Sequence, residues 1–168
     1  MRHWPIVLGL SISLVSAILG LRFLYLPIGA PVAVAFVLQS RTDFESIATE
    51  FGRKGLKAQA PAAIMGKSGV KHEFAFALVP DTGNVQIVVD TELSIKEVDE
   101  MKVLKFYVKV FDVGPEKAIF CVSPKLSGRA AAMAKEYGIT VIEDEVPKQL
   151  VPMAARAVEA ALTKRNHK

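Results

Sequence analysis

The sequence predicts a three-layer α/β domain with a mixed sheet, preceded by a segment that spans a membrane. The first forty residues contain no Asp or Glu and account for much of the positive mean hydropathy of +0.32. Beyond them, short apolar runs typical of strands alternate with amphipathic helical patterns. Such alternation is typical of a sheet that is covered by helices on both faces.

Charge and cysteine content narrow the classes of function. The chain has 168 residues, a formal net charge of +4 and an isoelectric point of about 9.2. Half of that charge lies in residues 1–40, and residues 41–168 carry nineteen Lys and Arg against seventeen Asp and Glu. This near balance gives little support to nucleic-acid binding through charge alone. The single cysteine, Cys121, excludes an intramolecular disulfide and fits a reducing compartment.

Residues 4–21 form an uncharged apolar run that is long enough to cross a membrane. As a helix rising ~1.5 Å per residue, the run spans about 27 Å, close to the ~30 Å hydrocarbon core. A second uncharged run, residues 23–38, follows Arg22 and is interrupted by Pro and Gly. Two layouts fit this pattern of apolar runs. One is a single helix over residues 4–26 followed by an apolar connector, and the other is a hairpin of two short helices. A cleaved signal peptide is disfavoured because the apolar character continues to Leu38.

Basic residues after the apolar segment set the expected orientation. Only Arg2 precedes the first run, whereas four basic residues follow the second closely: Arg41, Arg53, Lys54 and Lys57. Because basic flanks stay on the cytoplasmic side, we expect a membrane protein whose following domain lies in the cytoplasm. The expected organisation is a membrane anchor over residues 1–40, a main domain over residues 41–146, and an amphipathic helix with a basic tail over residues 147–168.

The first helix of the main domain is expected to begin at a capping box. The hydroxyl of Thr42 can accept from the amide of Glu45, whose carboxylate reaches back to the amide of Thr42. Apolar side chains then recur at helical spacing, namely Phe44, Ile47, Ala48 and Phe51. Gly55 is expected to end the helix.

Three strands are expected next. Residues 56–64 form a weak strand pattern, and residues 72–79 and 85–91 form two stronger ones around the turn PDTGN. These strands can form an antiparallel meander. The GKSG stretch, residues 66–69, is expected to be a turn, and His72 is expected to be a hydrogen-bonded structural residue.

Residues 95–112 give the clearest helical pattern, which Gly114 and Pro115 end. One apolar stripe consists of Met101, Leu104, Val108 and Phe111. A basic stripe beside it consists of Lys102, Lys105 and Lys109. Such a pairing of stripes is typical of a helix with one side in water.

The remaining elements alternate between strand and helix. Residues 117–123, KAIFCVS, are continuously apolar, as expected of a strand in the sheet's centre with both faces buried. A helix over residues 125–138, a strand over residues 139–143 and an amphipathic helix over residues 148–164 follow. The helices allow crossovers between strands of the same sheet.

This order resembles the core of the PD-(D/E)XK nuclease superfamily, and several short sequence motifs look like those of its Mrr-like branch. The similar stretches are FESIATEFGRKG, GKSGVKHEFAFAL, VQIVVDTEL, VLKFYVKVFDVGPEKAIFCVS and LSGRAAAMAKEYGITVIE. They cover about residues 43–143. The resemblance implies a restriction endonuclease-like fold with a three-layer core.

The resemblance also implies where a catalytic set would lie. In that family, an Asp on the second strand and a Glu-x-Lys on the third hold a divalent metal and activate water, because carboxylates bind Mg²⁺ and an ammonium orients the nucleophile. The Asp position falls on Ala75, and the Glu-x-Lys falls on Asp90, Thr91 and Glu92. One acid is kept, a second is missing, and a carboxylate replaces the cation. The resemblance thus implies a degenerate catalytic site.

The candidate site residues are Glu73, Asp90 and Glu92, with Glu73 and Asp90 as candidate metal ligands. Side chains two residues apart share one face of a strand, so these carboxylates meet if both strands face one pocket. Lys102 or Lys105 of the next helix would then replace the lost ammonium.

Two functions remain open from the sequence. With an eroded site and no metal, the domain would be a binding module. Its ligand would be DNA or another nucleic acid, a protein partner, or a second copy of the chain. With relocated catalytic residues, it would be a DNA endonuclease that uses Mg²⁺ or Mn²⁺. The incomplete set at Ala75 and Glu92 favours the first.

Overall fold

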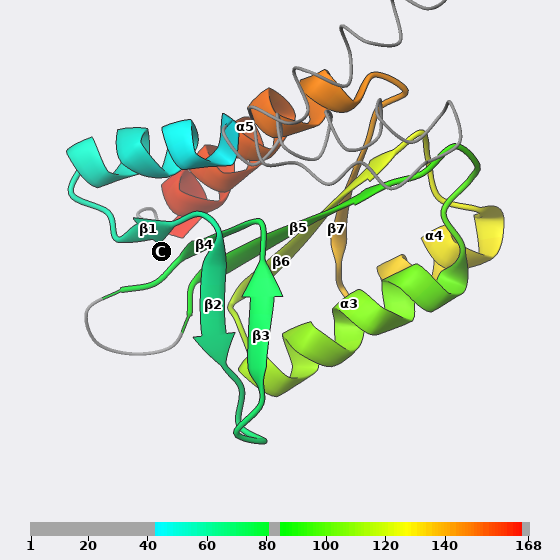
Figure 1. The fold of residues 1–168 in the computed structure, drawn as a ribbon, viewed down its shortest axis with the longest axis horizontal. Coiled ribbons are helices and arrows are strands. Elements are labelled where there is room, and N and C mark those ends of the chain that lie inside the picture. Colours follow the sequence, from blue (N-terminus) through cyan, green and yellow to red (C-terminus); the bar gives the residue numbers. More distant parts are fainter. Residues whose placement is uncertain (1–42, 81–84, 166–168) are drawn as a thin grey trace, which may run out of the picture. The chain divides into compact units, whose positions relative to one another are not determined.

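A mixed five-stranded sheet in the order β1-β4-β5-β6-β7 is the middle layer of the computed structural model, which describes residues 43–80 and 85–165 (Figure 1). Its strands are β1 Ala58–Gln59, β4 Phe76–Leu78, β5 Ile87–Leu93, β6 Lys117–Ser123 and β7 Thr140–Glu143. β1, β4 and β5 pair antiparallel, whereas β5, β6 and β7 pair parallel. The predicted α/β class with a mixed sheet is confirmed.

The predicted membrane anchor and the cap at Thr42 lie outside the described residues. So does most of the turn PDTGN, because residues 81–84 are not described. Within the described ranges, no helix is long and apolar enough to cross a membrane.

Helices cover both faces of the sheet. The helix over residues 43–53 and α5 (Pro147–Arg165) lie on one face, and α3 (Glu100–Val113) and α4 (Gly128–Glu136) lie on the other (Figure 1). β6 shows how the two cores arise: Phe120 and Val122 pack on the α3 side, and Ile119 and Cys121 pack on the α5 side. All four of these side chains are buried, as their continuous apolar run predicts.

Two of the predicted strands are each divided in the structure. Residues 56–64 form β1 and then β2 (Ala62–Met65), because Pro61 has no N–H with which to continue the ladder. Residues 72–79 form β3 (Lys71–Phe74) and β4, with a bend at Ala75. β2 and β3 pair as a separate antiparallel hairpin, joined by the predicted GKSG turn, that projects from the sheet (Figure 1).

The helix α3 differs from its prediction in its start and its buried side. It begins at Glu100, not residue 95, because the side chain of Asp99 accepts from the amide of Lys102 and caps it. Its buried residues are Val103 and Phe106. The predicted apolar stripe faces outward instead: Met101 and Val108 are each 55% exposed and Phe111 is 71% exposed.

The interior position of β6 predicts a strong effect of a buried charge. Val122 is fully buried, so Val122→Asp should lower the free energy of unfolding by about 3–5 kcal/mol, since an unpaired carboxylate cannot be solvated there. Chemical denaturation followed by circular dichroism measures this change. Val146→Asp is the matched control, because Val146 is 53% exposed and should tolerate the charge. Equal stability of the two variants would contradict the burial of β6.

Candidate functional site

The pocket that holds the predicted site residues exists because β5 is longer than β4. Phe76 of β4 pairs with Val89, and the following residues of β5 pair only with β6. A pocket of about 380 Å³ opens at this step in the sheet edge. Its lining includes the candidate carboxylates, neighbouring residues of the chain and one lysine: Glu73, Ala75, Asp90, Thr91, Glu92 and Lys109. The structure therefore brings the three candidate carboxylate residues to one pocket.

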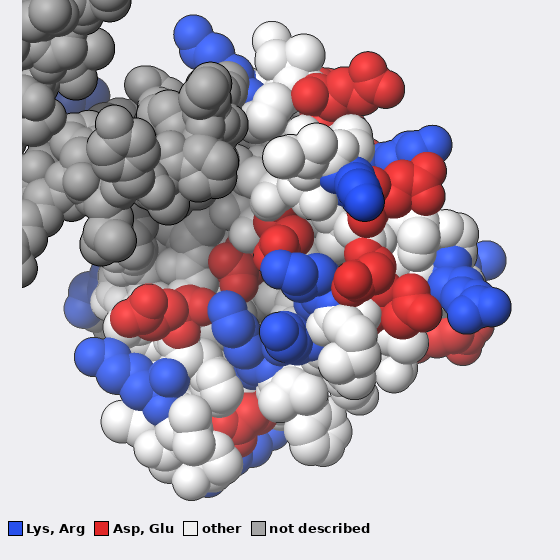
Figure 2. Space-filling model, turned by 45° about the vertical axis from the view of Figure 1, so that its right-hand side comes forward, with Lys and Arg blue, Asp and Glu red and all other residues white. Residues whose placement is uncertain are grey.

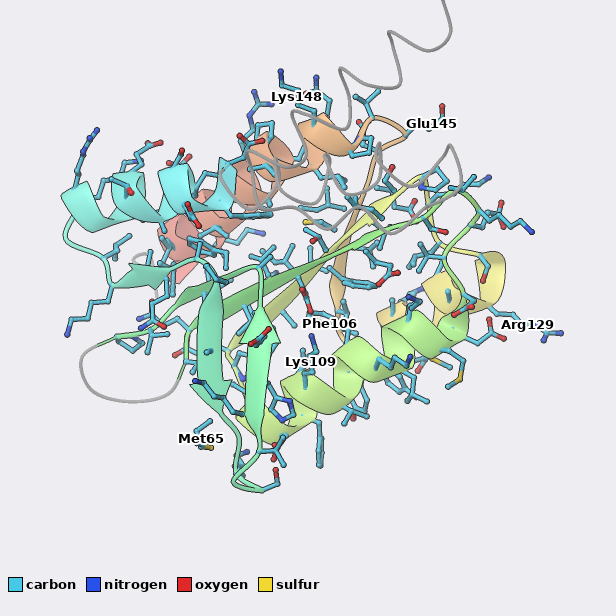
Figure 3. All side chains as sticks on the ribbon, in the orientation of Figure 1. Met65, Phe106, Lys109, Arg129, Glu145 and Lys148 are labelled. Atoms are coloured by element: carbon cyan, nitrogen blue, oxygen red, sulfur yellow. The ribbon has the colours of Figure 1, made fainter. Side chains whose placement is uncertain are left out.

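Lys109 is the cation of this pocket. Its Nζ lies 2.7 Å from Oδ2 of Asp90 and donates to the main-chain oxygen of Glu73 at 2.9 Å. It also lies 5.5 Å from the centre of the Phe74 ring. Figure 3 shows Lys109 and Phe106 on the side of α3 that faces the sheet. The ammonium thus ties α3 to β5 and to the β2–β3 hairpin at one point.

Asp90 is held largely away from water. Its side chain is 20% exposed, and Oδ1 accepts from the amide of Thr91 at 3.1 Å. Burial raises the pKa of Asp90 above its ordinary value, and the hydrogen bond from Lys109 opposes that rise without cancelling it. Lys109 is therefore the group that favours the charged carboxylate in this place.

Glu92 has a lysine of its own. Nζ of Lys102 lies 2.6 Å from Oε1 of Glu92, and this hydrogen bond raises the pKa of Lys102. Each candidate carboxylate on β5 is thus paired with a lysine of α3, and these two lysines lie about two helical turns apart. Such pairs lower the negative charge that would otherwise attract a cation to the pocket.

The remaining candidates are placed differently. The side chain of Glu73 is exposed at the pocket lining and makes no ion pair among the described residues. Lys105 is exposed and also makes no ion pair among them, so it does not supply the pocket's cation. Sequence reasoning preferred Lys102 or Lys105 for that position. The repeat of seven between Lys102 and Lys109 is the signal that these two share one side of the helix.

The arrangement does not fit a divalent metal as it stands. Carboxylate oxygens are suitable donors for Mg²⁺ or Mn²⁺, but Asp90 and Glu92 already bind lysines. Within residues 43–80 and 85–165, no three His, Cys, Asp or Glu side chains come close enough to hold a metal ion together. Metal binding by Glu73 and Asp90 therefore stays a prediction, and it requires the Asp90–Lys109 ion pair to open.

A second cluster fixes the hairpin that forms one wall of the pocket. Asp112, near the end of α3, accepts from the amide and the hydroxyl of Ser68 at 2.8 and 2.6 Å. Nε2 of His72 lies 2.6 Å from the same carboxylate, in agreement with the structural role predicted for this histidine. At Gly66, a Cβ would lie 1.9 Å from Oδ2 of Asp112, so glycine is what allows the close approach. Sequence reasoning missed Asp112, because its partners lie forty residues away.

Comparison with known proteins gives no family. No family model matches the chain, and no curated protein matches it. A solved structure titled "Crystal Structure of Protein of Unknown Function AF1548" is similar, with a TM-score of 0.47 and 16% sequence identity. The likeness covers 63% of this chain and 56% of that one, so this chain spans little more than half of that structure. A likeness of this size carries no argument about fold or function.

The contacts of Asp112 predict a pH dependence of stability. Hydrogen bonds from Ser68 and then His72 lower the pKa of Asp112 from 3.8 to about 2. A carboxyl lowered by folding stabilises the fold above its unfolded pKa and loses that contribution as the pH falls toward the folded value. Asp112→Asn should lower the melting temperature at pH 5, and this difference should shrink as the pH falls toward 2.

Thermal unfolding across pH 2–6 measures this difference. Glu97→Gln is the control, since it removes a carboxylate whose ion pair with Lys125 is half exposed at 3.1 Å. A constant difference between Asp112→Asn and the parent chain from pH 5 to pH 2 would contradict the role of the charged carboxylate.

Proposed function

We propose that the chain is a membrane-anchored binding module with a restriction endonuclease-like fold of the Mrr-like branch, in which the catalytic set has eroded. Its domain faces the cytoplasm, and its ligand is a protein or a nucleic acid. The single observation that carries the proposal is the pairing of both β5 carboxylates with lysines of α3. Both β5 carboxylates are neutralised by lysines of the same chain, and of the candidate carboxylates only Glu73 lacks an ion pair among the described residues. A nuclease of this kind instead leaves its carboxylates for a metal.

The residues that depart from the family's catalytic set, and the contacts that they make, both support the loss of catalysis. Ala75 lines the pocket at the position where the resemblance places a metal-binding Asp, and an alanine offers no donor. Glu92, at the position of the family's lysine, accepts from Lys102 instead of donating to a nucleophile. Two of the three functional positions therefore lack the chemistry that hydrolysis needs.

The surface favours a protein as the ligand. Figure 2 shows blue and red side chains interspersed over the face that it presents. Several lysines are committed to carboxylates, among them Lys54, Lys102, Lys109 and Lys125. A groove that follows a phosphate backbone needs an unpaired basic stripe, because affinity comes from the release of counterions by free cations.

A second candidate is a metal-dependent DNA endonuclease with relocated residues, and the position of Lys109 favours it. Its ammonium lies in the pocket, 2.7 Å from Asp90, where it could orient a water molecule if a metal displaced it from the carboxylate. Glu73 and Asp90 would then be the ligands of Mg²⁺ or Mn²⁺.

Restoring the family's set should create a metal site if erosion caused the loss. The change is Ala75→Asp with Glu92→Lys, combined with Lys102→Gln so that the new lysine does not meet Lys102. Ala75→Asp adds a carboxylate near Asp90 and Glu92→Lys supplies the family's cation, while Lys109 stays beside Asp90. We expect Mn²⁺ affinity to rise by about tenfold or more over the parent chain. Isothermal titration calorimetry with MnCl₂ measures the affinity.

The control for that triple variant replaces Ala75→Asp with Ala75→Asn, which has the same shape without the charge. It should bind Mn²⁺ no better than the parent chain. A parent chain that already binds Mn²⁺ as tightly, and that nicks supercoiled plasmid, would establish the endonuclease instead. Loss of that nicking in Lys109→Met would then identify the relocated cation.

The anchor is tested separately. Residues 4–21 are uncharged, so the full-length chain should stay in the membrane pellet after alkaline carbonate extraction. Residues 41–168 expressed alone should appear in the supernatant. Recovery of the full-length chain in the supernatant would rule out the anchor. It would not affect the proposal that the catalytic set of the pocket has eroded.

A further inference from the structure

The outward side of α3 carries an apolar stripe that no described residue covers well. Met101 and Val108 are each 55% exposed, Phe111 is 71% exposed, and Leu104 between them is half-buried. The opposite side of α3 packs on the sheet through Val103, Phe106, Val110 and Val113. The helix therefore carries apolar side chains on two opposite sides. An exposed apolar stripe on a structured helix marks a surface that another molecule covers.

The spacing of this stripe identifies the kind of molecule. Met101, Leu104, Val108 and Phe111 follow intervals of three, four and three, which is the pattern of a and d positions in a coiled coil. A stripe with this interval packs against a second helix that carries the same pattern. A second copy of the chain presents that pattern.

The charges beside the stripe select the direction of pairing. Glu100 and Lys105 lie at g and e positions on opposite flanks, and neither makes an ion pair among the described residues. In a parallel pair, Glu100 of each copy faces Lys105 of the other, which gives two ion pairs by symmetry. In an antiparallel pair, the two copies of Lys105 meet near the centre and repel each other.

The same charges argue against a lipid surface as the occupant. An interfacial helix needs free basic side chains beside its apolar face to bind anionic headgroups. On α3, Lys102 and Lys109 are bound to carboxylates, and Lys105 is accompanied by Glu100 and Asp99. The local charge beside the stripe is therefore balanced and not basic.

We propose that the outward face of α3 pairs in parallel with the same face of a second copy, so that the chain forms a symmetric dimer. The proposal does not depend on the chemistry of the pocket, which lies on the other side of the helix. A helix of 14 residues is ~21 Å long, so the interface is small and a dissociation constant in the micromolar range is expected. Attachment of both copies to one membrane would raise their effective concentration.

Variants of the full-length chain that each carry one added cysteine test the geometry in lipid vesicles. The native thiol, Cys121, is fully buried and does not interfere. In a parallel dimer Val108 faces its own copy, so Val108→Cys should form a disulfide-linked dimer under mild oxidation. Val146→Cys is the matched control, with 53% exposure against 55%, and should link at least about fivefold less because nothing brings two copies together there.

A charge exchange tests the pairing independently of cysteine chemistry. Glu100→Lys alone and Lys105→Glu alone should each weaken dimerisation by about three- to tenfold in analytical ultracentrifugation, since each creates two like-charge contacts. The double exchange should restore it. Circular dichroism of each variant separates these effects from loss of folding.

Four results would overturn the proposal. They are a monomeric parent chain, equal linking of Val108→Cys and Val146→Cys, an additive loss in the charge exchange, and preferred linking between a Leu104→Cys copy and a Val108→Cys copy. The last result would identify an antiparallel pair. A parent chain that stays monomeric while the stripe binds vesicles would assign the face to the lipid surface.

Discussion

The fixed orientation of α3 about its own axis is the constraint on which the pocket, the hairpin and the outer surface depend. Phe106 sets it: its ring stacks on that of Phe120 with centroids 4.7 Å apart and planes within 12°. The Phe74 ring meets Phe106 edge-on at 6.4 Å. Aromatic pairs of this kind add about 0.5–1.5 kcal/mol to the energy of burial, and they fix orientation as well as contact. Turning α3 would break both contacts.

That single orientation gives each side of the helix its role. Lys102 and Lys109 are directed to β5, where they pair with Glu92 and Asp90. Asp112 reaches the hairpin, and the apolar stripe is left facing outward. A buried carboxylate without its cation is costly, typically by several kcal/mol, so the Asp90–Lys109 pair must be kept once the helix is in place. The pairing of both β5 carboxylates is therefore a consequence of how the core packs.

The sheet contributes the other half of the site. Because β4 begins at Phe76, opposite Val89, while β5 continues to Leu93, the sheet has a step at its edge, and the hairpin closes one side of it. The resemblance places metal-nuclease chemistry at this step. In the proposed interpretation the pocket remains from such a site, while Ala75 offers no carboxylate and both β5 carboxylates are paired with lysines. The proposal of a binding module and not a hydrolase rests on this pairing.

The sequence alone predicts the kinds of element and most of their order, because these depend on local patterns. The interior position of β6 follows from KAIFCVS being apolar at successive positions, and Gly114 ends α3 in the left-handed conformation as expected. Alternation of side chains along a strand also predicts that Asp90 and Glu92 share one face, whereas the meeting of these two with Glu73 at one pocket depends on how the two strands face each other. Division of the long strands at Pro61 and Ala75 was not predicted, since pairing partners decide where a strand ends.

Only the tertiary structure decides which stripe of α3 is buried. Met101, Leu104, Val108 and Phe111 have the same spacing as the opposite set, Val103, Phe106, Val110 and Val113, so periodicity does not distinguish them. Phe120 of β6 decides which set is buried, because its ring stacks on that of Phe106. Once that contact forms, it also decides that Lys109 rather than Lys105 reaches Asp90. Contacts between distant segments carry this information, and a local pattern does not contain it.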